Sequence, residues 1–303
     1  MSSKNSIPVI KFLSFTLILC LGGLSCSPQR FLFNKVSNVF DSGIEIIYQE
    51  GDLELAERFL SSNLETIVIL VAQDPENPRL NLMAAQAFGA YAMAFVEDKD
   101  PQRAGLLYVR GLEYAFKSLP PQIRFSRNIT PADLEKLLVE SRKSDVPQLF
   151  WVGYNWGMYI LQNLDQPRLL GDLAKVELLM RRVAELDAGY NFGGVDIFYG
   201  TFYSARPPML GGNPELGRSY YLKNIERNPN FLMTKLYYAR YYAVQVQDKE
   251  LFDNLLTEIE TFDLESAPEI RLFNALAKQK ATNLRQNAEL FLDLNEILET
   301  NER

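Results

Sequence analysis

The stretch PRLLGDLAKVELLMRRVAELD, residues 167–187, shows most clearly how this chain folds. Its apolar side chains recur every three or four residues, which is the spacing of one face of an α-helix. Pro167 suits the first turn of a helix, where the amide hydrogen that proline lacks would have no intrahelical acceptor. The stretch therefore predicts one amphipathic helix, whose apolar stripe comprises Leu169, Leu173, Val176, Met180 and Val183, broadened by Leu170, Leu179 and Leu186.

The same spacing recurs along most of the chain, whereas the alternating patterns of strands are sparse. Turn residues separate the helical segments at DPENP (74–78), DKDP (98–101), SLPP (118–121) and NPN (228–230). The sequence thus predicts an all-α protein, with further helices over about 53–72, 79–96, 101–118, 131–142, 147–163, 192–204, 214–227, 231–246, 248–261 and 268–298.

The predicted helices come in pairs with a recurring junction. LVAQDPENPRL, VAELDAGYNF and IERNPNFLM each end a charged amphipathic helix, turn through Asp or Asn, and begin a more apolar helix. Asp187 and Asn228 are 41 residues apart, which is about one helix-turn-helix unit. Although the 34-residue tetratricopeptide signature is not cleanly present, the pattern predicts a tetratricopeptide-like repeat array, a compact α-solenoid with a concave face.

The composition excludes several kinds of active site. The chain has 303 residues, 47% of them hydrophobic, and no histidine, which excludes Ser-His-Asp triads and imidazole-bound zinc. Its two cysteines lie at positions 20 and 26, so they build neither a structural zinc site nor a disulfide framework. A net charge of −7 argues against electrostatic capture of nucleic acid. We expect no metal and no cofactor.

The first 26 residues have the pattern of an export signal. Lys4 and Lys11 precede the short apolar run FLSFTLILCLGGL, and small residues follow up to Cys26. The ending GLSC resembles the lipobox of bacterial lipoproteins, except that Gly23 stands where leucine is usual. We therefore expect a lipoprotein signal peptide over 1–25, lipidation of Cys26, a tether and first helix over 26–48, and a helical domain over 49–303. The alternative is plain secretion.

Three aromatic segments are candidates for binding. The segment 147–163, PQLFWVGYNWGMYILQN, is apolar nearly all round, so it is either a core helix or the lining of an apolar cavity formed by Trp151, Tyr154 and Trp156. The segment 236–245, LYYARYYAVQ, places Tyr237 and Tyr241 on one helix face and Tyr238 and Tyr242 on the next. Because each phenol hydroxyl needs a partner, these four tyrosines fit a partner groove as well as plain packing.

The third candidate, YNFGGVDIFYGTFYSARPP at 190–208, is predicted to line up polar and aromatic groups on one helix face: Asp196, Tyr199, Tyr203 and Arg206. Such a face can bind a ligand or form a helix–helix hydrogen-bond network. The following loop, LGGNPELG, favours a turn with Asn213 as helix cap over a phosphate cradle, since no strand leads into it. Thr130 is likewise predicted to cap a helix. The acidic runs Glu97–Asp98–Asp100 and Glu258–Glu260 are predicted to be helix ends and solvated faces.

An ordered set of segments resembles the T-component family of bacterial TRAP transporters, the TatT-like lipoproteins. The segments are LMAAQAFGAYAMAFVED (82–98), AGLLYVRGLEYAFKSL (104–119), DVPQLFWVGYNWGMYI (145–160) and LDAGYNFGGVDIFYGTFYSARPPMLGGNPELGRSYYLKNI (186–225). The chain departs from the family at Asp196, where members often have histidine. The resemblance implies a periplasmic helical lipoprotein, a homotrimer with a central pore and a cavity in each subunit, and binding to the periplasmic solute-binding P-component.

The sequence and the resemblance together favour a non-enzymatic function. We expect a lipid-anchored protein of the cell envelope, facing the periplasm, that docks a solute-binding protein and passes a small hydrophobic or carboxylated ligand. The alternative is a helical-repeat scaffold lipoprotein for protein assembly. A carboxylate-based hydrolase of envelope polymers is the third class, since glycosidases need no histidine.

Overall fold

The computed structural model describes residues 43, 45–163, 166–206, 208 and 211–292. The chain divides into two compact units, Met1–Glu45 and Ile46–Arg303, and the helices described below belong to the second. The predicted signal peptide, Cys26 and most of the predicted tether lie outside the described residues.

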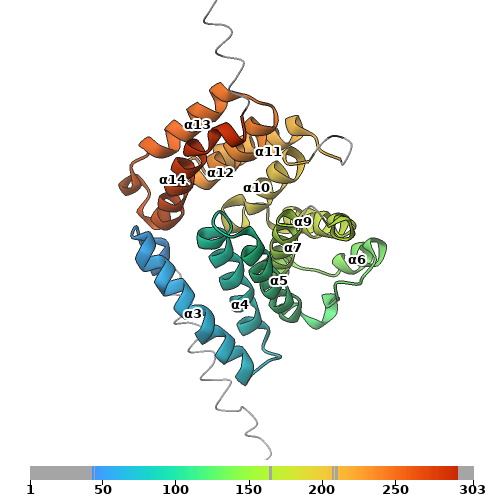
Figure 1. Ribbon diagram of the computed structural model, residues 1–303. Coiled ribbons are helices and arrows are strands. Elements are labelled where there is room, and N and C mark those ends of the chain that lie inside the picture. The colour runs from blue at the N-terminus through green and yellow to red at the C-terminus, as the bar shows by residue number, and fades with distance from the viewer. Residues whose placement is uncertain (1–42, 44, 164–165, 207, 209–210, 293–303) are drawn as a thin grey trace, which may run out of the picture. The chain divides into compact units, whose positions relative to one another are not determined.

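Every regular element in the described ranges is a helix, which confirms the all-α prediction (Figure 1). The α-helices are α3 (Leu53–Gln73), α4 (Pro78–Tyr91), α5 (Pro101–Ser118), α6 (Pro131–Leu138), α7 (Val146–Leu161), α8 (Pro167–Leu170), α9 (Leu173–Asp187), α10 (Tyr190–Ser204), α11 (Pro214–Arg227), α12 (Leu232–Tyr237), α13 (Lys249–Thr261) and α14 (Arg271–Gln286). Two π-helical turns, η1 (Ala92–Val96) and η5 (Tyr238–Ala243), extend α4 and α12. Short 3₁₀ turns are η2 (Pro121–Ile123), η3 (Lys143–Asp145), η6 (Leu264–Ser266), η7 (Pro268–Ile270) and η8 (Ala288–Leu290).

Side-chain caps followed by proline start several helices, because the first backbone N–H groups of a helix have no intrahelical acceptor. The hydroxyl of Thr130 accepts from the backbone N–H of Asp133, and the amide oxygen of Asn213 accepts from that of Leu216. Both predicted caps are confirmed, and the residues ahead of α11 act as a turn and cap.

The stretch 167–187 forms two helices where the sequence predicts one. Helix α8 ends at Leu170 and α9 begins at Leu173. The carboxylate of Asp172 lies at the break, 2.6 Å from Lys175 Nζ and 3.2 Å from Trp156 Nε1. Gly171 has low helix propensity, and Asp172 is held by these side-chain contacts, so the chain turns here instead of continuing the helix.

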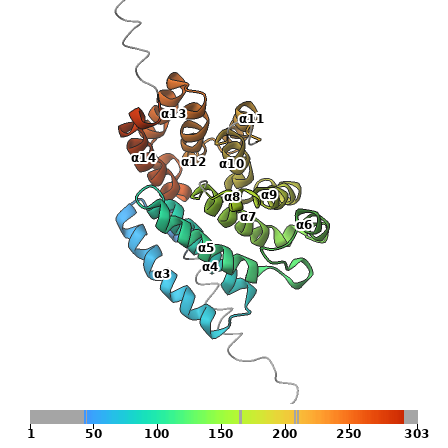
Figure 2. The same ribbon diagram turned by 45° about the vertical axis from the view of Figure 1, so that its right-hand side comes forward.

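Helices that lie near one another in sequence pack side by side, with the short helices α6 and α8 left out of this series. Helix α3 packs on α4, α4 on α5, α5 on α7 and α7 on α9, while α10 packs on α11 (Figure 2). Helices α12, α13 and α14 contact one another (Figure 1). The buried apolar side chains form three clusters. The tetratricopeptide-like repeat and the solenoid stay predictions.

Three helices come very close at Asn155 of α7. Its amide nitrogen donates to the carbonyl oxygens of Ala85 and Trp151, at 3.2 and 2.9 Å. Its Oδ1 atom lies so near Gly89 of α4 and Gly111 of α5 that a Cβ at either glycine would be 2.7 or 2.6 Å away. Only glycine therefore fits at these two positions.

A run of left-handed backbone starts α10. Asn191, Phe192 and Gly193 have φ values of 50°, 57° and 68°. Non-glycine residues adopt this conformation at a cost of roughly 1–3 kcal/mol each. The turn places the ring of Phe192 against Phe231, with centroids 4.7 Å apart, and Asn228 Nδ2 donates to Phe192 O at 3.1 Å.

Among the described residues, no helix is long and apolar enough to cross a bilayer.

Candidate functional site

The two π-helical turns bring polar residues from distant parts of the chain together. A π turn contains one extra residue and often marks a functional site. Glu97 directly follows η1, and Tyr241 lies within η5, close enough for the charge of Glu97 to raise the pKa of Tyr241. We call their surroundings the Glu97 cluster. It comprises Glu97, Asp98, Tyr108, Tyr154, Tyr237, Arg240, Tyr241 and Lys280.

Two carboxylates and two cations form the charged part of the cluster. Lys280 Nζ of α14 donates to Glu97 Oε1 at 3.1 Å, and both side chains are buried. Lys280 also contacts Asp98, whose other oxygen accepts from Arg240 at 2.7 Å. The four charges sum to zero. Such a pair is stable in the interior only because each charge has a partner and a hydrogen bond.

The ionisation of Asp98 and Arg240 reflects this pairing. Burial opposes the charge of Asp98, but Lys280 and Arg240 together lower the pKa of its carboxyl group below the ordinary value. The electrostatic interaction with Tyr241 raises the pKa of Arg240, and the nearby carboxylates of Asp98 and Glu97 act in the same direction. Both groups therefore stay charged at neutral pH.

Four phenols surround Glu97. The hydroxyl of Tyr108 donates to Glu97 Oε2 at 2.7 Å, and the hydroxyl of Tyr154 interacts with that of Tyr108. Burial raises the pKa of all four phenols, that of Tyr241 to about 12. The phenols are therefore protonated at neutral pH and act as hydrogen-bond donors.

The hydroxyls of Tyr237 and Tyr241 differ from those of Tyr108 and Tyr154. The two rings stack with centroids 5.8 Å apart, and both side chains are half-buried. Within the described ranges, neither hydroxyl donates to another residue, although desolvation by burial is the main cause of their raised pKa values. The cluster thus presents two donors that a small ligand with an oxygen acceptor can satisfy.

The four tyrosines that the sequence predicts to form one partner groove lie at two different places in the structure. Tyr237 and Tyr241 belong to the Glu97 cluster. Tyr238 and Tyr242 are buried against α11, where Tyr238 accepts from Arg218 Nε at 3.2 Å and Tyr242 donates to Glu215 at 2.7 Å.

The three residues of α7 that the sequence predicts to line one cavity also lie in different surroundings. The half-buried Tyr154 belongs to the Glu97 cluster, and the neighbouring Trp151 donates its indole N–H to Tyr190 at 3.3 Å. Trp156 is fully buried, and its indole N–H donates to Asp172. The ammonium group of Lys175 lies 5.0 Å from the Trp156 ring centroid, so this tryptophan joins α7 to α9.

The predicted polar face of α10 contacts neighbouring helices. Asp196 is buried and forms ion pairs with Lys223 and Arg227 of α11, at 2.8 and 2.7 Å. Tyr199 donates to Glu177 O at 3.3 Å, and its ring stacks on Tyr220 at 5.0 Å.

The other two predicted residues are Tyr203, further along α10, and Arg206, which lies beyond Ser204, the last residue of α10. Tyr203 donates to Glu177 Oε1 at 3.4 Å, so it joins α10 to α9. Arg206 covers the Phe202 ring at 3.5 Å. The contacts of Asp196, Tyr199 and Tyr203 join neighbouring helices, as in the helix–helix network that the sequence left open as an alternative, whereas Arg206 contacts Phe202 and Gly211.

Sequence reasoning missed five members of the cluster: Glu97, Asp98, Tyr108, Arg240 and Lys280. The prediction that Glu97 and Asp98 lie on a solvated face is wrong for Glu97, which is 5% exposed. It holds for Asp100, which caps α5 by accepting from Arg103 N at 3.0 Å. One signal in the sequence indicates that Glu97 is buried. The residue directly follows the apolar run AMAFV, so it belongs to the last turn of a buried helix and precedes the loop.

The described part of the chain has no group of His, Cys, Asp or Glu arranged to hold a metal ion.

In comparisons with known proteins, no curated protein matches the chain. The family model described as TRAP transporter T-component matches residues 49–292, which include all the helices from α3 to α14. The chain therefore belongs to the TRAP transporter T-component family.

Proposed function

We propose that this protein is the periplasmic, membrane-anchored accessory component of a TRAP-type transporter. In this role it docks the solute-binding protein of the transporter and binds a small hydrophobic or carboxylated ligand. The observation that carries the proposal is the family match over 49–292, which associates the chain with a TRAP transporter of the cell envelope. The N-terminal signal pattern and Cys26 support the anchor.

The Glu97 cluster is the ligand site of this proposal. Tyr237 and Tyr241 donate hydrogen bonds to a ligand oxygen, and the ring of Tyr154 supplies apolar contact. The charges of Glu97 and Lys280 are already paired with each other, so they position the phenols and do not attract ions themselves. The ligand is therefore held by donors and aromatic surface, which suits a compound with an oxygen-bearing head and an apolar body.

The ligand site is tested with octanoate as the probe, titrated into the purified protein by calorimetry. We expect the double variant Tyr237→Phe/Tyr241→Phe to bind octanoate at least about tenfold more weakly, because two charge-assisted hydrogen bonds are lost. Tyr238→Phe is the matched control, since that hydroxyl faces α11. Equal loss of affinity in the control and the double variant would contradict the site.

The anchor is tested by Cys26→Ser. Lipid chains hold a protein on a membrane by about 0.8 kcal/mol for each buried CH₂ group, so loss of the lipidated side chain releases the protein. We expect the variant in the soluble fraction and the wild type in the membrane fraction. A variant that still sediments with membranes contradicts the anchor and leaves the family assignment untouched.

A further inference from the structure

The outward face of α5 carries cations that lack carboxylate partners. Arg103, Leu106, Arg110, Glu113 and Lys117 follow one another at steps of three and four, so they share one helix face, and all five are exposed. Leu106 is 68% exposed. Across the described ranges, none of the three cations forms an ion pair. The face is therefore basic and partly apolar in a chain whose net charge is −7.

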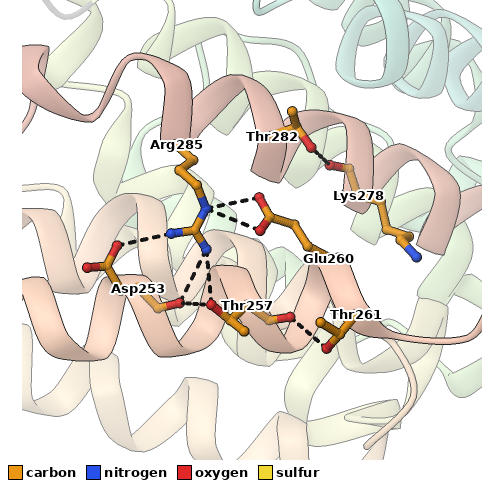
Figure 3. Close-up of polar contacts among 7 residues, drawn as sticks. All are labelled: Asp253, Thr257, Glu260, Thr261, Lys278, Thr282 and Arg285. Atoms are coloured by element: carbon orange, nitrogen blue, oxygen red, sulfur yellow. Dashed lines mark hydrogen bonds and ion pairs between the residues drawn. The ribbon is translucent and has the colours of Figure 1, made fainter.

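The cations of helix α14 differ from those of the α5 face, because each of them has an acceptor within the protein. This helix has four cations and no acidic residue. Arg285 donates to Glu260 and Asp253 of α13, each at 3.1 Å (Figure 3). Lys278 donates to the carbonyl oxygen of Phe262 at 2.7 Å, and Arg271 pairs with Glu265 at 2.6 Å. With Lys280 in the Glu97 cluster, all four have an acceptor, so the α5 face stands out.

Aromatic rings orient two of the α5 cations without neutralising them. The guanidinium carbon of Arg110 lies 4.5 Å from the centroid of the buried Phe88 ring, and Lys117 Nζ lies 5.9 Å from that of Tyr114. A ring face attracts a cation but accepts no N–H hydrogen bond comparable to that of a carboxylate. Arg103 has not even a ring contact. The donors of this face are consequently available to a partner.

We propose that the α5 face docks an acidic surface of the solute-binding protein, with Leu106 at the centre of the contact. This inference rests on the proposed function. From Arg103 to Lys117 the face extends about 21 Å, at about 1.5 Å per residue, which is comparable to the width of a typical interface of about 800 Å² per partner. An exposed leucine among cations matches the apolar centre and charged rim of such interfaces.

A protein partner suits the face better than an anionic membrane. Glu113 lies between Arg110 and Lys117 in the row, where a continuous negative surface would repel it. A folded partner can place a cation opposite Glu113 and acidic groups opposite the three cations, which fixes the register of docking.

The test uses the purified full-length protein and the solute-binding protein of the same transporter. The charge-reversed variant Arg103→Glu/Arg110→Glu/Lys117→Glu is compared with Arg142→Glu/Arg168→Glu/Lys249→Glu, which reverses three exposed cations on other segments and has the same net charge. Leu106→Asp tests the apolar centre separately. Circular dichroism melting checks that all variants fold, and surface plasmon resonance gives the dissociation constants at low and high salt.

We expect the α5 triple variant to bind at least about tenfold more weakly and the control within about threefold of the wild type, since like charges across an interface are strongly unfavourable. Leu106→Asp should weaken binding about tenfold, and salt should weaken wild-type binding by screening. Equal affinities of the α5 triple variant and the control overturn the docking face alone. A wild type that does not bind the solute-binding protein overturns the proposed docking function as well.

Vesicles containing phosphatidylglycerol distinguish a membrane from a protein partner. We expect the Cys26→Ser protein and its α5 triple variant to bind these vesicles equally weakly. If the triple variant loses vesicle binding and keeps its affinity for the solute-binding protein, the face is a membrane contact and the inference is overturned.

Discussion

The ammonium group of Lys280 lies 3.1 Å from Glu97 Oε1, although 183 residues separate the two in sequence. Their side chains are 5% and 4% exposed, so the pair is shielded from water. It joins the end of η1 to the middle of α14. The packing of α14 on the earlier helices thus depends on a charge pair as well as on apolar contact.

Replacing Lys280 should therefore be costly. In Lys280→Met the carboxylates of Glu97 and Asp98 lose their shared cation. Glu97 then remains buried with a negative charge that no cation neutralises. Breaking a buried pair in this way typically costs about 3–5 kcal/mol. We expect a loss of this size in the free energy of unfolding, measured with urea. The exposed Lys249→Met should change it by no more than about 0.5 kcal/mol.

The double variant Glu97→Gln/Lys280→Met separates the pair from the packing of Lys280. We expect it to recover part of the stability lost in Lys280→Met, since the uncompensated charge of Glu97 is removed. A double variant less stable than Lys280→Met would show that the aliphatic part of Lys280 matters more than its charge.

Alkaline pH should destabilise the protein through its phenols. Burial raises the pKa of Tyr241 from the usual 10.0 to about 12. Between these values the unfolded chain loses a proton that the folded protein keeps, so the free energy of unfolding falls as pH rises from about 10 to about 12. Tyr241→Phe removes this contribution. We expect its stability to fall less steeply with pH, as measured by urea unfolding across this interval, and parallel pH profiles would contradict the burial of the Tyr241 hydroxyl.

Acidic pH acts through Asp98 with the opposite sign. Lys280 and Arg240 keep the pKa of Asp98 below the usual 3.8 in the folded protein. The stability from this ionised carboxylate is present above that value and is lost as pH falls through the lowered pKa. Asp98→Asn should be less stable than the wild type at neutral pH, and its unfolding free energy should depend less on pH below about 4. A variant with the acid dependence of the wild type would place the titrating group elsewhere.

The left-handed start of α10 makes Gly193 sensitive to substitution. In Gly193→Ala the new Cβ would lie 2.4 Å from Asn224 Oδ1, at a φ of +68° that disfavours alanine. We expect a loss of at least about 2 kcal/mol from strain and overlap together, measured by thermal unfolding. Gly171→Ala is the control, since its Cβ would be 3.6 Å from the nearest atom, an ordinary contact. Similar losses in the two variants would show that the strain at Gly193 is relieved by the backbone.

The sequence was sufficient to predict helices because their signals are local. The apolar spacing of α9 and the caps at Thr130 and Asn213 depend on residues within one or two turns, and the structure has them where they were predicted. The break at Asp172 was harder to predict, because Gly171 is its only clear local signal and part of what holds Asp172 there is Trp156, which is on another helix.

The candidate site was harder to predict because its members are far apart in sequence. The sequence marks Tyr154 as a candidate cavity residue and Tyr237 and Tyr241 as candidates for a partner groove, in two separate segments. Glu97 and Lys280 gave no local signal of pairing, since an acidic residue at a helix end usually faces water. The extra residue in each π turn also rotates the residues that follow, which periodicity does not reveal.

The contact of Asn155 with Gly89 and Gly111 has a consequence for how this sequence can vary. A side chain at either glycine is blocked while Asn155 remains, and a larger residue at 155 is blocked while the helices stay this close. A larger residue at position 89 or 111 is therefore tolerated only together with a smaller residue at position 155. In related chains the residues at these three positions should change together. The combination found in a related sequence then indicates how closely its helices α4, α5 and α7 pack, without a structure.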